Sequence, residues 1–323
     1  MTTIELSEQR KAEIFERRIK RRFLHAEQGA ALPGKPEFAI FGGQPGAGKS
    51  GVLTTTTADM RTRGATWSVN ADDFAVYHPS YKQLQKEHGA AAADMVRGVT
   101  SGWVKQTIEA AQQRQVNVVF ESTMRQPDLV KQTIGDFRSK GYNTHAIMLA
   151  VSPEVSWQGN NLRRENLAAT GAPSRLATRE AHDAAVSGSV QTIEKLEKDR
   201  AVDRLTIVNR SGDTLYRNEL VAGDWKNAPQ AAATLQAYRA QPMQPDAARV
   251  HDRNWEQIEK MASARHARDK APAQLAKSEI HDIRAARSAD AVTHHLQSVD
   301  GGKSAQQIRT QQREPTGPDK GRA

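Results

Sequence analysis

Residues 43–50 constrain the architecture of this 323-residue chain most strongly, and they read Gly43-Gln44-Pro45-Gly46-Ala47-Gly48-Lys49-Ser50. The segment fits the pattern Gly-x-x-x-x-Gly-Lys-Ser/Thr of a phosphate-binding loop, or P-loop. It follows an apolar, strand-like run at residues 38–41 and opens a helical pattern, which is the required context. In such a loop, backbone N–H groups surround the phosphates, Lys49 reaches the β and γ oxygens, and Ser50 offers a hydroxyl to Mg²⁺. We therefore expect residues 43–50 to bind ATP and Mg²⁺.

Short apolar runs alternate with longer helical patterns around this loop. The apolar runs lie at residues 38–41, 66–69, 116–120, 145–151 and 205–208. One helical pattern begins near residue 49, and three others cover about residues 90–113, 128–140 and 180–198. Strands that alternate with helices, and that are apolar enough to be buried on both faces, predict a parallel sheet with helices on both sides. The expected fold is α/β, a doubly wound and mostly parallel sheet of the P-loop kinase type.

The two ends of the chain differ from this middle part. A helix is expected to start at Ser7, with Phe15, Ile19 and Phe23 forming an apolar stripe that lies on the core. After about residue 227 the composition shifts to alanine, glutamine and charged residues. We expect a kinase domain over residues 1–227, a charged helical extension over 228–300 that adds little to the core, and a disordered tail over 301–323.

The composition excludes several classes of protein. The chain has no cysteine, which rules out disulfides, thiolate zinc sites and a cysteine nucleophile. It also lacks an apolar run of membrane-spanning length and the apolar core of a signal peptide, so we expect a cytoplasmic protein with no membrane partner. The net charge of +9 is compatible with nucleic-acid binding. However, the tail mixes acidic with basic residues and has few aromatic residues for stacking, so nucleic acid is not the expected partner.

Carboxylates follow the second and third expected strands. Asp72 and Asp73 come after the second strand, and Glu121 ends the third, before Ser122-Thr123-Met124-Arg125. Ligands bind at the carboxyl edge of a parallel sheet, so an aspartate there could orient and deprotonate an acceptor hydroxyl that faces the γ-phosphate. Capping of the following helices is the competing explanation. A P-loop alone does not separate kinases from GTPases or motors, but these carboxylates favour a kinase of a small molecule.

Arginines gather late in the expected domain. Arg163 and Arg164 are adjacent, and Arg175 follows a Gly171-Ala172-Pro173 loop. Arginines above the phosphates would neutralise the charge that spreads over the equatorial oxygens during transfer, although arginines are also common on solvated helices. Neighbouring residues point about 100° apart around a helix, so the sequence leaves open whether Arg163 or Arg164 faces the phosphates.

Four separated motifs, in order, resemble the zeta-toxin family. The family carries D-x-D-x-F followed by an H-P-x-[YF] turn, and this sequence has Asp72, Phe74, His78-Pro79 and Tyr81. Residues 121–125 resemble its E-G-T-x-R motif. Residues 156–165 and 175–183 resemble its paired-arginine segment and the A-H-D helix that follows. The resemblance extends over roughly residues 6–217.

The resemblance implies a function and a set of site residues. Family members use ATP and Mg²⁺ to phosphorylate UDP-N-acetylglucosamine on a sugar hydroxyl, act as toxins, and are held inactive by a helical antitoxin over the nucleotide site. The implied partners are thus a nucleotide-sugar substrate and either a small helical antitoxin or an inhibitory segment of this chain. The implied roles are Lys49 and Ser50 on ATP and magnesium, Asp72 as catalytic base, Arg163 and Arg175 as stabilisers of the transferred phosphate, and His78, Glu121, Thr123 and Arg125 at the substrate.

Several positions depart from the family pattern. Asn70 stands where an aspartate is usual, Ser122 and Met124 replace glycines, and Ala75 replaces a basic residue. These positions flank the implied acceptor pocket, so the acceptor could be a different nucleotide sugar or another nucleotide such as NAD. The alternative from a different class is a P-loop ATP switch associated with nucleic acid, motivated by the basic N-terminal helix and the arginine-rich tail.

Overall fold

The computed structural model describes residues 4–25, 34–171 and 177–291, which fall into two compact units. The first unit extends to Arg239 and contains the sheet, and the second begins at Ala240. The expected disordered tail, residues 301–323, lies outside the described residues.

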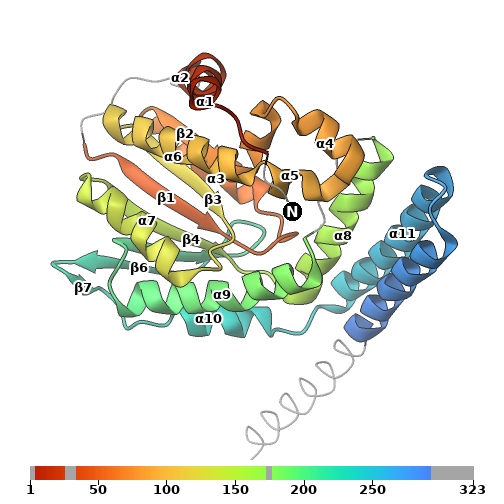
Figure 1. Cartoon of the computed structure of the whole chain (residues 1–323). Coiled ribbons are helices and arrows are strands. Elements are labelled where there is room, and N and C mark those ends of the chain that lie inside the picture. The colour runs from red at the N-terminus through yellow and green to blue at the C-terminus, as the bar shows by residue number, and fades with distance from the viewer. Residues whose placement is uncertain (1–3, 26–33, 172–176, 292–323) are drawn as a thin grey trace, which may run out of the picture. The chain divides into compact units, whose positions relative to one another are not determined.

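Within the described residues, the first unit is built on a seven-stranded sheet of order β2-β3-β1-β4-β5-β6-β7 (Figure 1). The strands are β1 (Glu37–Gly42), β2 (Thr66–Asn70), β3 (Asn117–Ser122), β4 (Asn143–Leu149), β5 (Arg204–Val208), β6 (Thr214–Val221) and β7 (Asp224–Trp225). Strands β1 to β5 are parallel, whereas β6 pairs antiparallel with β5 and with β7. The predicted mostly parallel α/β sheet is confirmed, and β6 and β7 extend it beyond the five expected strands.

Helices connect and cover the strands. They are α1 (Glu8–Ile14), α2 (Lys20–His25), α3 (Ser50–Thr62), α4 (Tyr81–His88), α5 (Ala92–Met95), α6 (Arg97–Arg114), α7 (Pro127–Ser139), α8 (Pro153–Ala169), α9 (Arg179–Lys198) and α10 (Ala231–Arg239), with a π-helical turn at Phe15–Ile19 and 3-10 segments at Ala71–Tyr77 and Gly89–Ala91. Helix α8 was not among the helical patterns that apolar periodicity predicted, although a helix was assumed at Arg163 and Arg164. Its buried positions hold polar side chains such as Gln158, Asn160 and Glu165, so no apolar stripe marks it.

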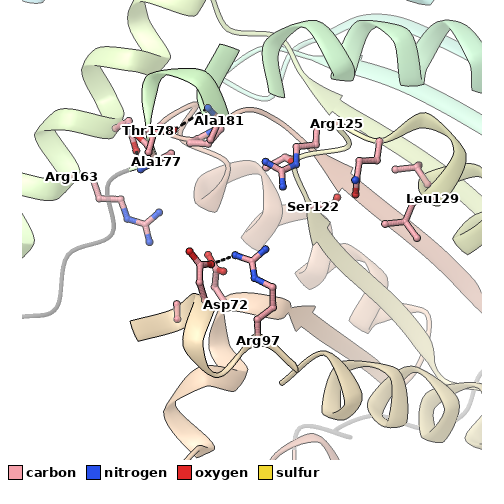
Figure 2. Close-up of a pocket in the computed structure, with 17 residues that line it drawn as sticks. Asp72, Arg97, Ser122, Arg125, Leu129, Arg163, Ala177, Thr178 and Ala181 are labelled. Carbon is pink, nitrogen blue, oxygen red and sulfur yellow. Dashed lines mark hydrogen bonds and ion pairs between the residues drawn. The ribbon is translucent and has the colours of Figure 1, made fainter. Parts of the chain in front are cut away.

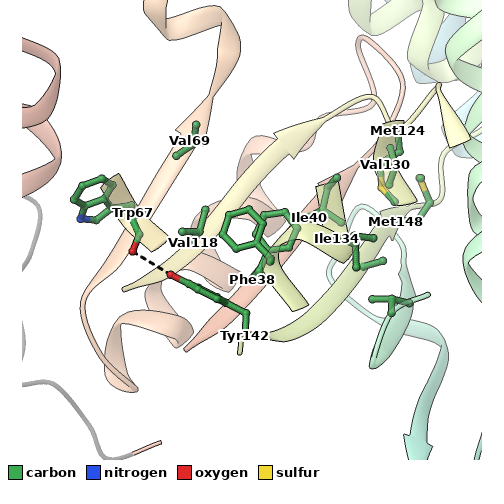
Figure 3. Packing of buried hydrophobic residues seen from close by; sticks show 14 of the residues in the cluster. Phe38, Ile40, Trp67, Val69, Val118, Met124, Val130, Ile134, Tyr142 and Met148 are labelled. Atoms are coloured by element: carbon green, nitrogen blue, oxygen red, sulfur yellow. Dashed lines mark hydrogen bonds between the residues drawn. The ribbon is translucent and has the colours of Figure 1, made fainter. Parts of the chain in front are cut away.

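Alternating side chains of β1 divide the core into two layers, one on each face of the sheet. Phe38 and Ile40 pack into a cluster that contains residues of α6, α7, α9 and α10 (Figure 3). Ala39 and Phe41 point to the other face, where they meet Met60 of α3. Because successive residues of a strand face opposite sides, a strand that is apolar at every position requires cover on both faces. The sheet is therefore doubly wound, as predicted.

The N-terminal helix packs as its apolar stripe predicted. Ser7 caps it by accepting a hydrogen bond from the backbone N of Arg10 at 3.3 Å. Phe15, Ile19 and Phe23 are all buried, and the ring of Phe23 lies 5.1 Å from that of Trp67 on β2. The helix therefore covers the sheet next to the segment that follows β2.

Helix α10 belongs to the sheet-containing unit, which corrects the expectation that the domain ends near residue 227. Its residues Ala231 and Leu235 are fully buried in the main core cluster. A carboxylate of Glu197 on α9 accepts a hydrogen bond from the backbone N of Ala231 at 2.9 Å, which stabilises the N-terminus of α10. Two small or medium apolar residues one turn apart are a weak sequence signal, so the composition of this segment hid its place in the core.

The second unit is helical over its described part, as expected for a charged extension. Helix α11 (Pro245–Arg268) is followed by a helix over residues 273–291. Asp290 accepts hydrogen bonds from Trp255 Nε1 at 2.8 Å and pairs with His251 at 2.7 Å. Ion pairs join the two helices at Arg284–Glu259, Arg287–Asp252, Arg287–Glu256 and Arg265–Glu279. The unit is therefore held together by contacts of its own.

A partly buried charge cluster lies across β1, β4 and β5. Glu37 accepts a hydrogen bond from Arg204 at 2.5 Å, and His145 pairs with Thr206 through Nε2 at 2.9 Å. Burial lowers the pKa of His145 to about 4, against the opposing effect of Glu37. Burial disfavours the charge of Glu37, but its hydrogen bond with His145 and the charge of Arg204 outweigh this and lower its pKa to about 2. His145 is therefore neutral in the folded protein at neutral pH.

This cluster predicts a loss of stability on acidification. The folded pKa of His145 lies below the unfolded value of about 6.5, so between these values the unfolded state binds more protons and the free energy of unfolding falls as pH falls. The slope of the free energy of unfolding against pH should therefore be smaller in His145→Gln, by up to about 1.4 kcal/mol per pH unit between about pH 6 and 4.5. Denaturant titrations across this range, with the surface substitution His88→Gln as control, measure the slope. A slope that His145→Gln leaves unchanged would contradict the prediction.

Candidate active site

The P-loop lies between β1 and α3 and rests directly on the backbone of α8. Gly46 and Gly48 adopt φ values of 77° and 81°, in the left-handed region that favours glycine. A Cβ atom on Gly46 would lie only 2.0 Å from the carbonyl oxygen of Ser156 and 2.4 Å from the backbone N of Asn160. Glycine is therefore required at position 46 both by the turn and by this close approach, and the loop shape depends on α8.

The side chain of Gln44 anchors the loop from behind. It is fully buried and donates from Nε2 to the carbonyl oxygen of Val151 at 2.8 Å and to Ser156 Oγ at 3.1 Å. Its Oε1 accepts a hydrogen bond from Arg239 Nη2 at 2.9 Å. Gln44 is thus held by Val151, which follows β4, by Ser156 of α8 and by Arg239 of α10.

Lys49 lies at the bottom of the loop with its charge partly buried. Its Nζ donates to the carbonyl oxygen of Gly43 at 3.0 Å and lies 3.6 Å from Glu121 Oε1. Burial lowers the pKa of Lys49, Arg163 lowers it further, and the charges of Glu121 and Asp72 act in the opposite direction. A buried ammonium among these groups is suited to meet the phosphate oxygens of a nucleotide.

Glu121 and Asn70 form a connected pair at the ends of neighbouring strands. Asn70 Nδ2 donates to Glu121 Oε2 at 2.7 Å, while Asn70 Oδ1 accepts from the backbone N of Asp72 at 3.0 Å. Glu121 therefore faces Lys49 and Asn70 and does not cap α7, whose N-cap Gln126 makes no side-chain cap bond. An aspartate at position 70 could not donate this hydrogen bond.

The structure separates the roles of Asp72 and Asp73. Asn70 provides the cap of the segment that follows β2, so capping does not account for either aspartate. Asp73 Oδ2 pairs with Arg22 of α2 at 2.8 Å, which ties it to the N-terminal helix. Asp72 instead lines the cavity in front of the P-loop. Of these two aspartates, only Asp72 therefore shares a cavity with the P-loop.

A cavity of about 520 Å³ opens beside the P-loop, and its lining includes six of the expected site residues: Pro45, Gly46, Asp72, Thr123, Arg125 and Arg163 (Figure 2). Asp72, Arg125 and Arg163 lie on different sides of it. The polar and loop residues that line it are Pro45, Gly46, Asp72, Asp94, Arg97, Ser122, Thr123, Arg125, Gln126, Asn160, Arg163 and Thr178. The cavity volume falls within the roughly 300–1,000 Å³ that is typical of sites for small ligands.

The arginines that the sequence singled out have different positions. Arg163 lines the cavity, whereas Arg164 lies against Glu165, with Nε 3.8 Å from Oε1. Of the two arginines, Arg163 is therefore the one that faces the cavity beside the P-loop. Arg175 lies outside the described residues.

His78 lies apart from the other expected substrate residues. Its side chain is only 2% exposed and lines a different cavity, together with Pro79, Tyr81 and Lys82. Burial also lowers the pKa of its ring. The structure therefore does not bring His78 to the cavity that holds Asp72.

Met124 shows how one departure from the family pattern is accommodated. It adopts a φ value of 50°, a region in which glycine is favoured, and its side chain is fully buried. Its carbonyl oxygen accepts a hydrogen bond from Thr192 Oγ1 at 2.6 Å. Packing and this hydrogen bond hold the backbone turn that carries Thr123 and Arg125 into the cavity.

Three further arginines approach the site but were not singled out from the sequence. Arg97 of α6 pairs with Asp94 at the cavity wall. Arg210, after β5, donates from Nε to the carbonyl oxygen of Ala47 at 3.1 Å, and Arg239 reaches Gln44. The last two are distant in sequence from the P-loop, so no local motif marks them.

Ser50, the one residue that was expected to bind Mg²⁺, begins α3 directly after Lys49. No group of three or more His, Asp or Glu side chains that could hold a metal ion occurs in residues 4–25, 34–171 and 177–291. Along the same residues, no helix has both the length and the apolar character of a membrane span.

The fold and the loop define a P-loop protein of the kinase-like class, and comparison with known proteins identifies the family. The family model described as zeta toxin matches residues 22–221, and the chain therefore belongs to the zeta toxin family. The chain is 26% identical to Toxin PezT of Streptococcus pneumoniae over 223 residues, which are 69% of this chain and 85% of the relative. It is 28% identical to Toxin zeta of Enterococcus hirae over 204 residues, 63% of this chain and 71% of that protein.

Solved structures support the same fold. A structure of the PezAT chromosomal toxin–antitoxin system of Streptococcus pneumoniae matches with a TM-score of 0.66 and 22% identity, covering 79% of this chain and 98% of that one. A crystal structure of AvrRxo1-ORF1:-ORF2 with ATP matches with a TM-score of 0.52 and 11% identity, covering 80% and 85% of the two chains.

Because Gly46 lies so close to α8, a single methyl group added at position 46 should lower the stability of the fold strongly. We expect Gly46→Ala to destabilise the fold by at least about 2 kcal/mol, because the Cβ atom collides with backbone and the φ value is unfavourable. Thermal unfolding and ATP titration would both register the change. Gly135→Ala on α7 is the matched control, since open space surrounds that position, and it should be neutral or stabilising. Equal behaviour of the two variants would contradict this account of the loop.

Proposed function

We propose that this chain is an ATP- and Mg²⁺-dependent phosphotransferase that phosphorylates a hydroxyl of a nucleotide sugar similar to UDP-N-acetylglucosamine, and that it acts as a toxin. The main support is that Asp72 and the P-loop residues Pro45 and Gly46 line one cavity. Membership of the zeta toxin family supports the toxic activity. The finer assignment of the substrate rests on the resemblance of the motifs to that family.

In the proposed reaction, Asp72 is the base. The acceptor hydroxyl oxygen attacks the γ-phosphorus, the bond to the β–γ bridging oxygen breaks, ADP leaves, and the hydroxyl proton passes to the Asp72 carboxylate. Asp72 is exposed and lines the cavity, whereas Asp73 pairs with Arg22 and does not line it. Asn70 fixes the backbone that carries Asp72.

The cations around the cavity suit the charge that develops on the transferred group. Lys49 lies in the loop and Arg163 on the cavity wall, so both can neutralise phosphate oxygens. Ser50 would hold Mg²⁺ together with nucleotide oxygens, and the ion when bound supplies further charge neutralisation. Glu121, which accepts a hydrogen bond from Asn70 and lies 3.6 Å from Lys49 Nζ, helps to hold the ammonium group in place.

The cavity chemistry is consistent with a nucleotide acceptor. Arg97 and Arg125 project from separate elements into the same cavity as Ser122 and Thr123. Guanidinium groups bind phosphate in a fixed, bidentate geometry, and hydroxyls can hydrogen-bond to a sugar. A nucleotide sugar and a dinucleotide such as NAD share the pyrophosphate that these groups would contact, so NAD is the alternative acceptor.

We also propose that a small helical antitoxin is the partner of this chain. The support is the likeness to the PezAT toxin, whose structure is described as part of a toxin–antitoxin system. The helical second unit is the other candidate for an inhibitor. However, it is closed by its own ion pairs and by the Trp255–Asp290 hydrogen bond, so we favour a separate antitoxin.

The assignment of the base predicts different effects for two neighbouring substitutions. We expect Asp72→Asn to lower kcat by about 10²- to 10⁴-fold, the usual contribution of a general base, and to leave ATP affinity nearly unchanged. Asp73→Asn, the matched control, should retain most activity because that carboxylate pairs with Arg22 away from the cavity. Single-turnover kinetics and ATP titration separate the two quantities. Normal transfer by Asp72→Asn would refute the role of Asp72.

The acceptor itself can be identified by mass spectrometry. The protein is incubated with ATP, Mg²⁺ and a panel of UDP-sugars and dinucleotides, and the products are examined for the mass of one added phosphate. Phosphorylation of a UDP-sugar supports the proposal, and phosphorylation of NAD selects the alternative acceptor. ATP hydrolysis that depends on DNA or RNA, without any phosphorylated acceptor, would replace the kinase by a nucleic-acid-associated switch.

The independence of the second unit predicts the outcome of a truncation. A chain that ends at Arg239 keeps α10 and the core of the first unit intact, so we expect it to phosphorylate the acceptor at the rate of the full chain. A marked rise in rate on truncation would instead identify the second unit as an inhibitor in cis. Thermal unfolding of both chains controls for loss of structure.

A further inference from the structure

Arg239, the last residue of α10, contacts the P-loop from behind and is buried in doing so. Its side chain is only 7% exposed. Nη2 donates to Gln44 Oε1 at 2.9 Å and to Ser189 Oγ at 3.1 Å, and Nη1 donates to the carbonyl oxygen of Val186 at 3.0 Å. One guanidinium group thus joins α10, α9 and the P-loop.

The contact with Gln44 completes the hydrogen bonding of that side chain. Gln44 Nε2 is already used by Val151 and Ser156, so Arg239 supplies the donor for its remaining polar atom. A buried amide has well-defined rotamers only when both of its ends are satisfied. Arg239 is therefore one of three residues that hold the side chain of Gln44, and with it this part of the loop.

The charge of Arg239 is also unusual in its surroundings. Among the described residues, no carboxylate forms an ion pair with it, and its Nε atom is buried without a hydrogen-bond partner. Burial lowers its pKa to about 10, so the group still carries its charge at neutral pH. A buried cation without an anionic neighbour is costly, and an anion bound in the adjacent loop reduces that cost.

Arg239 lies beyond residues 22–221, the segment that the zeta toxin model matches. We propose that Arg239 is a positioning residue for ATP binding: it orients the P-loop through Gln44 and adds positive potential behind the phosphate site. This inference rests on the proposed function, because it assumes that the loop binds ATP. A purely structural role, in which Arg239 only docks α10 on α9, is the competing explanation.

Variants of α10 distinguish the two explanations. Arg239→Met removes the charge and the hydrogen bond to Gln44, and Arg239→Lys keeps the charge but loses the forked geometry. Leu235→Ala is the matched control, since Leu235 lies on the same helix, is fully buried and does not contact the P-loop through a hydrogen bond. ATP affinity is measured by calorimetric titration without acceptor, and Tm by thermal unfolding.

We expect Arg239→Met to weaken ATP binding about tenfold and Arg239→Lys about threefold, the loss typical of a charged hydrogen bond. The KM for ATP should rise while the KM for the acceptor stays constant. Leu235→Ala should lower the Tm and leave the Kd for ATP within about twofold of the wild type. Combining Gln44→Met with Arg239→Met should weaken binding little beyond either single change, because the two residues act through one contact.

Two results would overturn the inference. The first is that Arg239→Met lowers the Tm as Leu235→Ala does but binds ATP as tightly as the wild type. The second, which applies if Arg239→Met does not fold, is that Arg239→Lys binds ATP with unchanged affinity. Failure of the wild-type protein to bind ATP would instead refute the proposed function, so the two failures are distinguishable.

Discussion

The close approach between Gly46 and the backbone of α8 is the constraint on which the site depends. The P-loop keeps its curvature only because no side chain separates Gly46 from Ser156 and Asn160. The same helix carries Arg163 to the cavity, so this contact ties the loop to the element that holds the arginine. The sheet supports this arrangement, since β1 ends in the loop and β4 leads into α8.

Buried charge links the loop to its surroundings. Lys49 is flanked by Glu121 and by Gly43, and Arg239 lies behind Gln44 without a carboxylate partner among the described residues. Desolvation lowers the pKa of both cations. The folded chain therefore holds positive charge where water cannot fully screen it, which strengthens its interaction with an anionic ligand.

The sequence predicted the parallel strands, the P-loop and the carboxylates at the strand ends, because each has a local pattern. It assumed a helix at Arg163 and Arg164 but did not give the bounds of α8, since buried Gln158 and Asn160 interrupt any apolar periodicity, although Ser152-Pro153 is a typical helix start. It missed the antiparallel β6, whose side chains are mostly half-exposed at the edge of the sheet. Contacts such as Arg239 with Gln44 join residues far apart in the chain, and no local motif encodes them.

Asn70 has a further consequence for how a polyanionic molecule reaches the site. Where the family pattern has an aspartate, this chain has a neutral amide that donates to Glu121. The strand ends beside Lys49 therefore carry one negative charge fewer than the family pattern would place there. Diffusional encounter is faster when a cleft lined by cations carries fewer opposing charges, and this advantage shrinks as ionic strength rises.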